Sequence, residues 1–390
     1  MKRRLAELLL HGGKAPRWLF ERMTRLAGAI TMAVVDEHGP ADMLRRLSDP
    51  WWFQAFGCVL GFDWHSSGVT TVTCAAMKEA FKQFGDDMGI IVAGGKGGTS
   101  RKTPNEIAEQ SGRLAITGGD QLIHASRTSA KVDSAAVQDG YQVYQHAFFF
   151  TPAGQWCVVQ QGMNEQRGWA RRYHWLGESV DDFVREPHEG ICDLAKTARC
   201  PRFDDDAHPL LNMVADEADA NRKGCAQLVR DNHQHLIDEI ERLTAGPTLF
   251  APAHHPVLPS DINVDRLQRI VHTAHEQHPE NFEQLLTTAQ VGPATLRSLS
   301  LIAELIYDAP ASHRDPASAY DDADTRNGRR WADYSYAHGG KDGHPFPVDR
   351  DTYDRNIHIL LDAVRTSRLG ETDKRDALKR LAAATETTIS

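Results

Sequence analysis

The chain is poor in cysteine and has no long apolar run. Its six cysteines are widely separated and none forms a C-x-x-C pair, which argues against a zinc ribbon, an iron–sulfur cluster or a disulfide scaffold. No stretch approaches the roughly 18 consecutive apolar residues that a membrane span needs. The basic and apolar N-terminus is interrupted by His11-Gly12-Gly13-Lys14, so we expect no signal peptide. The simplest expectation is a cytoplasmic protein with reduced thiols.

An excess of positive charge is also absent. Lys and Arg number 44 against 53 Asp and Glu, which gives a net charge of −9 and opposes approach to nucleic-acid phosphates. The distribution of charge matters more than the sum, however. Basic residues cluster at Lys96 with Arg101 and Lys102, and at Arg171 with Arg172. DNA binding is feasible if such clusters converge on one face, and the hypothesis weakens sharply if they do not.

The usual motifs for nucleotide hydrolysis and serine catalysis are missing. No G-x-x-x-x-G-K-[ST] loop and no G-x-S-x-G elbow occur. Gly-Gly-Lys occurs three times, and its glycines serve either as flexible turns or as concave anion sites formed by backbone N–H groups. The loop Gly94–Lys102 is the strongest of the three because it adds hydroxyls and two further cations. We expect no metal and no cofactor.

Length and patterning indicate an α+β protein of two domains. A chain of 390 residues exceeds what one core usually supports. We expect a mixed α/β N-terminal domain over 1–250 and an α-helical, hairpin-bearing domain over 251–390. Helices are expected at Trp18–Val35, Pro40–Leu47, Val72–Phe84, Leu210–Arg242, Val264–Glu276, Phe282–Thr288, Ala294–Tyr307 and Arg355–Arg365. Strands are expected at Met88–Ala93 and, as a hairpin, at Tyr141–Phe150 and Trp156–Gln161.

The most informative stretch is Leu285–Leu301, which predicts two helices around a tight turn at Val291-Gly292-Pro293. Gly292 can take a positive φ, and Pro293 suits a first helical position because it lacks an N–H group. The second helix would direct free N–H groups and a positive dipole end outward, where they can receive a phosphate. An ordinary helical hairpin inside an α-helical core explains the same residues equally well.

Farther along, Val348-Asp349 follows the hairpin and an intervening apolar helix. Over Asn281–Ile359 this arrangement resembles the helix-hairpin-helix DNA glycosylase superfamily. The family usually has L-P-G-V-G at the turn, whereas this chain has Thr288-Ala289-Gln290-Val291-Gly292, and an insertion spans Asp308–His344. The resemblance implies that Asp349 is the catalytic carboxylate, in a protein that acts on duplex DNA with a damaged or modified base.

The resemblance also bears on the nucleophile. Family members that cut the DNA backbone carry a lysine where this chain has Ala294. The resemblance therefore implies that water is the nucleophile and that Asp349 stabilises positive charge on the deoxyribose. Lys341, in a glycine-rich stretch of the insertion, is either a replacement amine or a solvated loop residue.

Two sets of binding residues complete the hypothesis. The expected DNA-backbone contacts are Val291, Gly292, Pro293, Thr295, Arg297, Lys96, Arg101, Lys102, Arg171 and Arg172. The expected base-pocket residues are Gln160, Gln161, Asn164, Tyr173 and His174, amides and aromatics suited to base edges and stacking. For the run Ala170–Trp175, a packed Trp175 with solvated arginines is an equally good explanation.

Across nearly its whole length the chain also resembles an uncharacterised prokaryotic family, a domain of unknown function found in archaea and bacteria. The segments that carry this resemblance include HSSGVTT at 65–71, GGKGGTSRKTP at 94–104, ARRYHW at 170–175 and AHGGKDGHPFPVDRDTYD at 337–354. It implies no activity. Two alternatives to a glycosylase therefore stay open, a non-catalytic nucleic-acid-binding protein and a nuclease with its active site in the N-terminal domain. The sequence does not indicate an oligomeric state.

Overall fold

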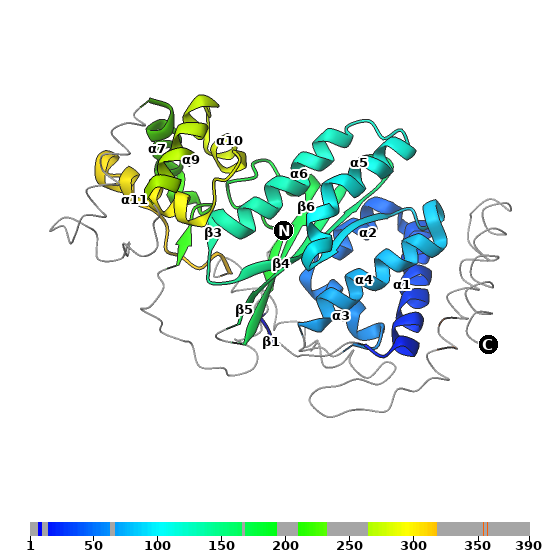
Figure 1. Cartoon of the computed structure of the whole chain (residues 1–390). Helices are drawn as coiled ribbons and strands as arrows, with labels where there is room; N and C mark the ends of the chain where they lie inside the picture. The colour runs from blue at the N-terminus through cyan, green and yellow to red at the C-terminus, as the bar shows by residue number, and fades with distance from the viewer. Residues whose placement is uncertain are drawn as a thin grey trace.

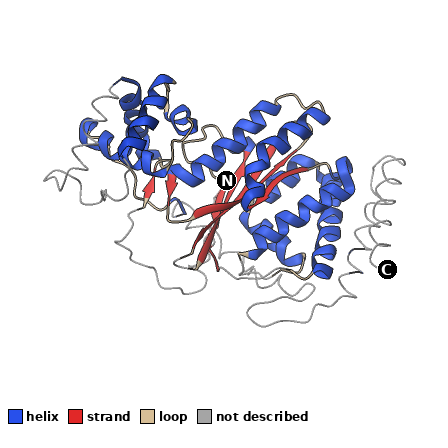
Figure 2. Ribbon diagram, in the orientation of Figure 1, coloured by secondary structure: helices blue, strands red, loops and turns tan. Residues whose placement is uncertain are grey.

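An antiparallel sheet with helices on both faces forms the centre of the protein (Figures 1 and 2). The computed structural model describes residues 7–9, 15–62, 67–165, 168–192, 210–231 and 264–317, together with Asp354 and Ile357. Helices and an antiparallel sheet in one chain make this an α+β protein, as the sequence predicts. Among the described residues, no helix is both long enough and apolar enough to cross a membrane.

The large sheet runs in the order β1-β6-β5-β4-β2. β1 pairs with the first part of β6 (169–171), and β7 pairs with the next part (172–174). Its strands are β1 (Glu7–Leu9), β2 (Ile91–Lys96), β4 (Gln142–Phe150), β5 (Trp156–Asn164), β6 (Trp169–Leu176) and β7 (Gly190–Cys192). A separate small sheet pairs β3 (Val137–Gln138) with β8 (Leu211–Asn212). The predicted β4–β5 hairpin is confirmed, with its turn closed by the Thr151 N–H donating to the Gln155 carbonyl at 2.9 Å.

Two groups of helices cover the two faces of the sheet. On one face lie α1 (Arg17–His38), α2 (Pro40–Ser48), α3 (Pro50–Val59) and α4 (Gly68–Phe84). The other face carries α5 (Thr103–Arg113) and α6 (Gly119–Lys131), followed by a π-helical turn at Val132–Ala136. Beyond α6 lie α7 (Asp219–Asp231), α9 (Val264–Glu276), α10 (Phe282–Thr287) and α11 (Pro293–Tyr307).

Strand alternation divides the core between the two faces. In β4, Ala147 and Phe149 point toward α1–α4, whereas Phe148 and Phe150 point toward α5 and α6. The α5/α6 face belongs to a single buried cluster that continues from the sheet through α7 to the hairpin α10–α11. The boundary predicted near residue 250 lies outside the described residues, and this cluster contains residues from both sides of it.

Amphipathic helices are where the sequence prediction is best. Those expected at Trp18–Val35, Pro40–Leu47, Val72–Phe84, Val264–Glu276, Phe282–Thr288 and Ala294–Tyr307 correspond to α1, α2, α4, α9, α10 and α11. The helix expected to begin at Leu210 is wrong at its start, because Leu211–Asn212 forms β8 and α7 begins only at Asp219. The strand expected at Met88–Ala93 begins later, at Ile91, since Gly89 turns the chain with a φ of 69°.

Candidate nucleic-acid interface

The helical hairpin predicted at Leu285–Leu301 is formed by α10 and α11. Asn281 caps α10 by accepting a hydrogen bond from the Gln284 N–H at 3.0 Å, and Pro293 occupies the first turn of α11. The expected positive φ at Gly292 is wrong: its φ is −142°, and Gln290 takes the left-handed conformation with a φ of 67°. The turn therefore bends two residues earlier than its sequence indicates. That these helices form a DNA-binding helix-hairpin-helix remains a hypothesis.

Side chains from the end of α6 and from β3 hold the hairpin turn. Lys131 Nζ donates to the Val291 carbonyl, and Gln138 Nε2 donates to the Pro293 carbonyl at 2.9 Å. Arg297 donates through Nε and Nη2 to Gln138 Oε1 at 3.1 and 2.8 Å. Burial lowers the pKa of Lys131. These contacts fix the turn, and they commit part of the Arg297 guanidinium to the protein.

A basic groove lies between α9 and this turn. It has a volume of about 470 Å³ and is lined by Arg266, Arg269, His272, Thr273 and Gln290. Polar side chains of α9 line the groove because this helix is strongly amphipathic, with its apolar side packed in the core and its polar side exposed. The buried residues of α9 are Leu267, Ile270, Val271 and Ala274.

The groove is chemically suited to an anion. Arg266 and Arg269 are exposed, and guanidinium groups bind phosphate oxygens through paired N–H donors. Gln290, which lines the groove, belongs to the turn that precedes α11. The first N–H groups of α11 carry the positive end of its helix dipole. Neither arginine was identified from the sequence. Both lie on the polar side of the predicted helix Val264–Glu276, and this pattern could have indicated them.

The glycine-rich segment formed by the end of β2 and the 3₁₀ helix Gly97–Lys102 is a second basic segment. Gly94, Gly95 and Gly97 have φ values of 88°, 144° and 58°, and Lys96 lies with its Nζ 5.5 Å from the centre of the Tyr144 ring. A Cβ at Gly94 would lie 2.2 Å from the His146 carbonyl oxygen, so the close approach of β2 to β4 requires glycine there. The expected phosphate contacts Lys96, Arg101 and Lys102 are all exposed on this segment.

The two arginines of β6 point into the protein instead. Arg171 Nη1 contacts Asp139 at 2.8 Å and Asp315 at 2.9 Å, and Arg172 Nη1 donates to Gln54 at 2.9 Å. The exposed fractions of Arg171 and Arg172 are 3% and 0%. Both guanidinium groups thus serve intramolecular contacts, and neither lies on the surface with the loop cations.

The expected base-pocket residues are divided between the two faces of the sheet. Gln160 and Tyr173 face α6: Gln160 Nε2 donates to Asp133 at 2.6 Å, and Tyr173 Oη donates to Asp139 at 2.8 Å. Gln161 and His174 face α1–α4, and His174 accepts from Arg172 Nε at 2.8 Å. Asn164 lies half-buried at the end of β5. The structure therefore places these residues on two neighbouring strands, β5 and β6, without uniting them in one pocket.

A buried hydrogen-bond network under α6 was not anticipated from the sequence. Asp133, in the π-helical turn, accepts from Gln160 Nε2 and from Trp175 Nε1 at 2.9 Å, and it pairs with His188 Nε2 at 2.5 Å. Gln160 Oε1 in turn contacts His146 Nδ1 at 2.9 Å. π-Helical turns often occur at functional sites. The residues of this network are far apart in the sequence, so no local motif could have predicted that they form hydrogen bonds with one another.

The expected catalytic residues Asp349 and Lys341 lie outside the described residues. Nearby in sequence, Asp354 forms a two-pronged ion pair with Arg22 of α1, at 3.0 Å for each contact. Ile357 is buried in the core between α1–α4 and the sheet. This part of the C-terminal segment therefore contacts α1, which lies on the opposite side of the molecule from α10 and α11 in Figure 1.

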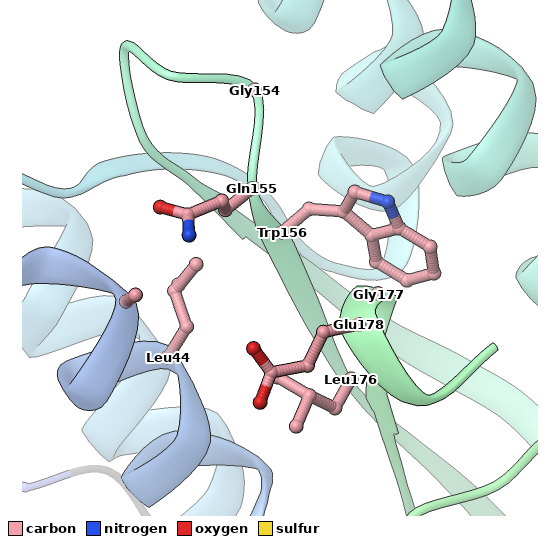
Figure 3. Close-up of a pocket in the computed structure, with 8 residues that line it drawn as sticks. Leu44, Gly154, Gln155, Trp156, Leu176, Gly177 and Glu178 are labelled. Carbon is pink, nitrogen blue, oxygen red and sulfur yellow. The ribbon is translucent and has the colours of Figure 1, made fainter.

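Another pocket, of about 240 Å³, lies between α2 and the β4–β5 turn (Figure 3). Leu44 and Leu176 form its apolar wall, and Gln155 and Glu178 lie at its rim. Glu178 is already paired with Arg45, at 2.5 and 2.8 Å. In the part of the chain that the structure describes, Glu178 is the only charged residue that lines the pocket, so its lining carries no unmatched charge. Among the described residues, no group of three or more His, Cys, Asp or Glu side chains could hold a metal ion.

Comparison with known proteins assigns the chain to a family. Residues 4–348 match the family described as "Protein of unknown function (DUF763)", and the chain belongs to that family. No curated protein and no solved structure matches the chain. The expected membership of an uncharacterised family is thereby confirmed.

Proposed function

We propose that the protein binds DNA through the groove between α9 and the α10–α11 turn. The observation that carries this proposal is the position of Arg266, Arg269 and His272 beside that turn. Gln290, which takes the left-handed conformation in the turn before α11, lines the same groove. This local concentration of donors offsets the net charge of −9, because phosphates respond to nearby charge more than to distant charge.

The reaction proposed at this DNA is excision of a damaged or modified base. The resemblance of Asn281–Ile359 to glycosylases supports it, with Asp349 assisting attack by water and Ala294 in the position of the missing lysine. Such a reaction needs the carboxylate near DNA that the hairpin holds. Asp354, which follows Asp349 closely in the sequence, contacts α1 on the far side of the molecule from α11 in Figure 1. Substitution of Asp349 itself is therefore the decisive test of this reaction.

The binding proposal is tested with Arg266→Gln and Arg269→Gln. Each variant should weaken binding to an undamaged duplex about tenfold at low salt, and the slope of log K against log[salt] should fall by roughly one. Lys82→Gln, which removes an exposed cation on α4, is the matched control and should bind as the wild type does. Equal affinity of all four proteins would contradict the proposal.

The reaction is tested with duplexes carrying uracil, hypoxanthine, oxidised guanine or an alkylated base. Strand cleavage that appears only after alkali, and is lost in Asp349→Asn but kept in Asp351→Asn, is the expected result. DNA binding without product from any duplex would leave a binding protein in place of a glycosylase. Cleavage of undamaged DNA that EDTA abolishes would indicate a nuclease instead.

A further inference from the structure

One row of polar side chains crosses four strands on the α1–α4 face of the sheet. The pairing register places Lys96 of β2 opposite Gln145 of β4, Gln145 opposite Gln161 of β5, and Gln161 opposite Arg172 of β6. Directly opposed side chains lie about 4.5–5.5 Å apart at Cβ. The row therefore has a cation at each end and two primary amides between them.

The two central amides are buried and incompletely paired. Gln145 is 1% exposed, and apart from an interaction with the Cys74 thiol neither its Nε2 nor its Oε1 has a hydrogen-bond partner. Gln161 Nε2 donates to the Ser67 carbonyl at 3.0 Å and to Tyr144 Oη, but its Oε1 has no partner. Buried amides are almost always satisfied, and an unsatisfied one is costly. Three such atoms on adjacent residues indicate that the row is built for a partner.

Helix α4 covers the row, and Lys96 is the exposed residue at one end of it. The thiol of Cys74 on α4 lies close by: burial raises its pKa to about 12, while the Arg172 charge and a hydrogen bond from Gln145 act in the opposite direction. Lys96 is exposed and Tyr144 is half-buried. Beyond Lys96, the 3₁₀ helix Gly97–Lys102 carries the exposed Arg101 and Lys102, and added Cβ atoms at Gly97 or Gly98 would meet nothing within 4 Å.

We propose that this row is a nucleotide-binding site, in which Gln145 and Gln161 bind the edge of a nucleobase and the loop from Lys96 to Lys102 binds its phosphate. A primary amide presents one donor and one acceptor side by side, which matches base edges such as N6 and N7 of adenine. The Tyr144 ring offers a surface for stacking. The proposal deepens the proposed function, since the ligand is either a free nucleotide or a nucleotide extruded from DNA.

Binding requires a local movement, because the unpaired amide atoms are closed from solvent. The movement has a defined place, the first turn of α4. There the Ser67 carbonyl is held by Gln161, and the Ser67 side chain makes no capping hydrogen bond. Release of this contact, together with the hydrogen bond to Tyr144 Oη, would free Gln161 Nε2, so that both amides could then turn to the ligand.

The test uses the full chain and Gln145→Met, an unbranched apolar replacement of similar size. Free nucleoside 5′-monophosphates at about 1 mM, and duplexes with one extrahelical nucleotide, serve as probes in thermal unfolding and in direct titration. The variant should unfold about 1–2 °C higher than the wild type without ligand, because a buried unpaired amide is removed. It should bind the probe at least about tenfold more weakly. Gln142→Met, at an exposed position of the same strand, should change neither property.

The two kinds of probe distinguish a free nucleotide from a nucleotide extruded from DNA. A shift with free nucleotides that Gln145→Met abolishes supports a free ligand, and a Gln145-dependent preference only for the extrahelical duplex supports an extruded one. If no probe binds, or if binding is equal in wild type and Gln145→Met, the proposal is overturned. Arg266→Gln distinguishes this result from failure of the DNA-binding proposal, since that variant should lose duplex affinity and keep its response to free nucleotides.

Discussion

At the residue scale, the most consequential feature is a set of polar side chains buried against the sheet. His174 is fully buried, donates from Nδ1 to the Leu47 carbonyl at 3.0 Å and accepts from Arg172 Nε. Burial, together with the Arg172 charge, lowers the pKa of His174 well below its ordinary value. Burial likewise lowers the pKa of His146 on the other face. Both histidines are therefore neutral in the folded protein at neutral pH.

This predicts a loss of stability in mild acid. The unfolded chain protonates these histidines near pH 6.5, whereas the folded chain does so only at lower pH, so the unfolded state binds more protons below about pH 6.5. Stability is therefore fully present above that pH and falls as the pH decreases. His174→Gln, whose amide can replace both hydrogen bonds, should flatten the change in unfolding midpoint between about pH 7.5 and pH 5.5.

Urea unfolding at the two pH values measures this effect. His38→Gln, at an exposed site on α1, is the control and should leave the pH dependence of the wild type intact. The dependence should be reduced rather than abolished in His174→Gln, since His146 still contributes with the same sign. An unchanged slope in His174→Gln would show that the pKa of His174 is not lowered in the folded protein.

Single residues were also the hardest level to predict from the sequence. The run Arg171–Trp175 has the composition of a nucleic-acid surface, and its arginines and aromatics were expected to contact DNA. In the structure each has a partner far away in sequence, such as Asp139 for Tyr173 or Gln54 for Arg172. Composition indicates which chemistry a side chain offers, but only the fold determines whether that side chain faces solvent.

At the element scale, the contact between α1 and α4 depends on a glycine. A Cβ at Gly28 of α1 would lie 2.1 Å from Cε2 and 2.5 Å from Cδ2 of the Phe84 ring. Phe84 is fully buried at the end of α4, where the core leaves the ring little room to shift. The two helices can approach this closely only because Gly28 has no side chain.

Gly28→Ala should therefore destabilise the fold by about 1–3 kcal/mol, despite the better helix propensity of alanine. The measurement is chemical unfolding at neutral pH. Gly112→Ala on α5, where an added Cβ would meet nothing within 4 Å, is the matched control and should be neutral or slightly stabilising. The double variant Gly28→Ala with Phe84→Leu should recover part of the loss, and a Gly28→Ala protein as stable as the wild type would contradict the close packing.

Elements with a clear pattern of apolar residues were predictable, including the β4–β5 hairpin, whereas β6 and the start of α7 were not. Helix α9 was predicted with its exact bounds because its apolar residues recur at helical spacing. Strand β6 was missed because buried polar side chains hide its alternation: Arg171 and Tyr173 meet partners on one face, and Arg172 and His174 on the other. The start of α7 was placed too early because the apolar residues at Leu210–Val214 belong to β8 and its flanks.

At the scale of the whole molecule, the helical hairpin and the sheet share one hydrophobic core. The cluster on the α6 face joins Phe148 and Trp175 of the sheet to Leu285, Leu296 and Leu299 of the hairpin. Polar contacts reinforce this junction, including those from Lys131 and Gln138 to the hairpin turn. A cut near residue 250 would expose apolar surface on both fragments, in amounts that isolated domains rarely tolerate.

We therefore expect fragments 1–250 and 251–390 to fold poorly when each is produced alone. Each should bind a hydrophobic dye and unfold without a sharp transition, whereas co-expression should yield a complex that unfolds cooperatively, because the shared core is restored. Circular dichroism and size-exclusion chromatography provide the measurement, with the intact chain as the reference. A fragment 251–390 that unfolds cooperatively by itself would establish the two-domain division expected from the sequence, and it would show that the hairpin's contacts with α6 and β3 join two separately stable units.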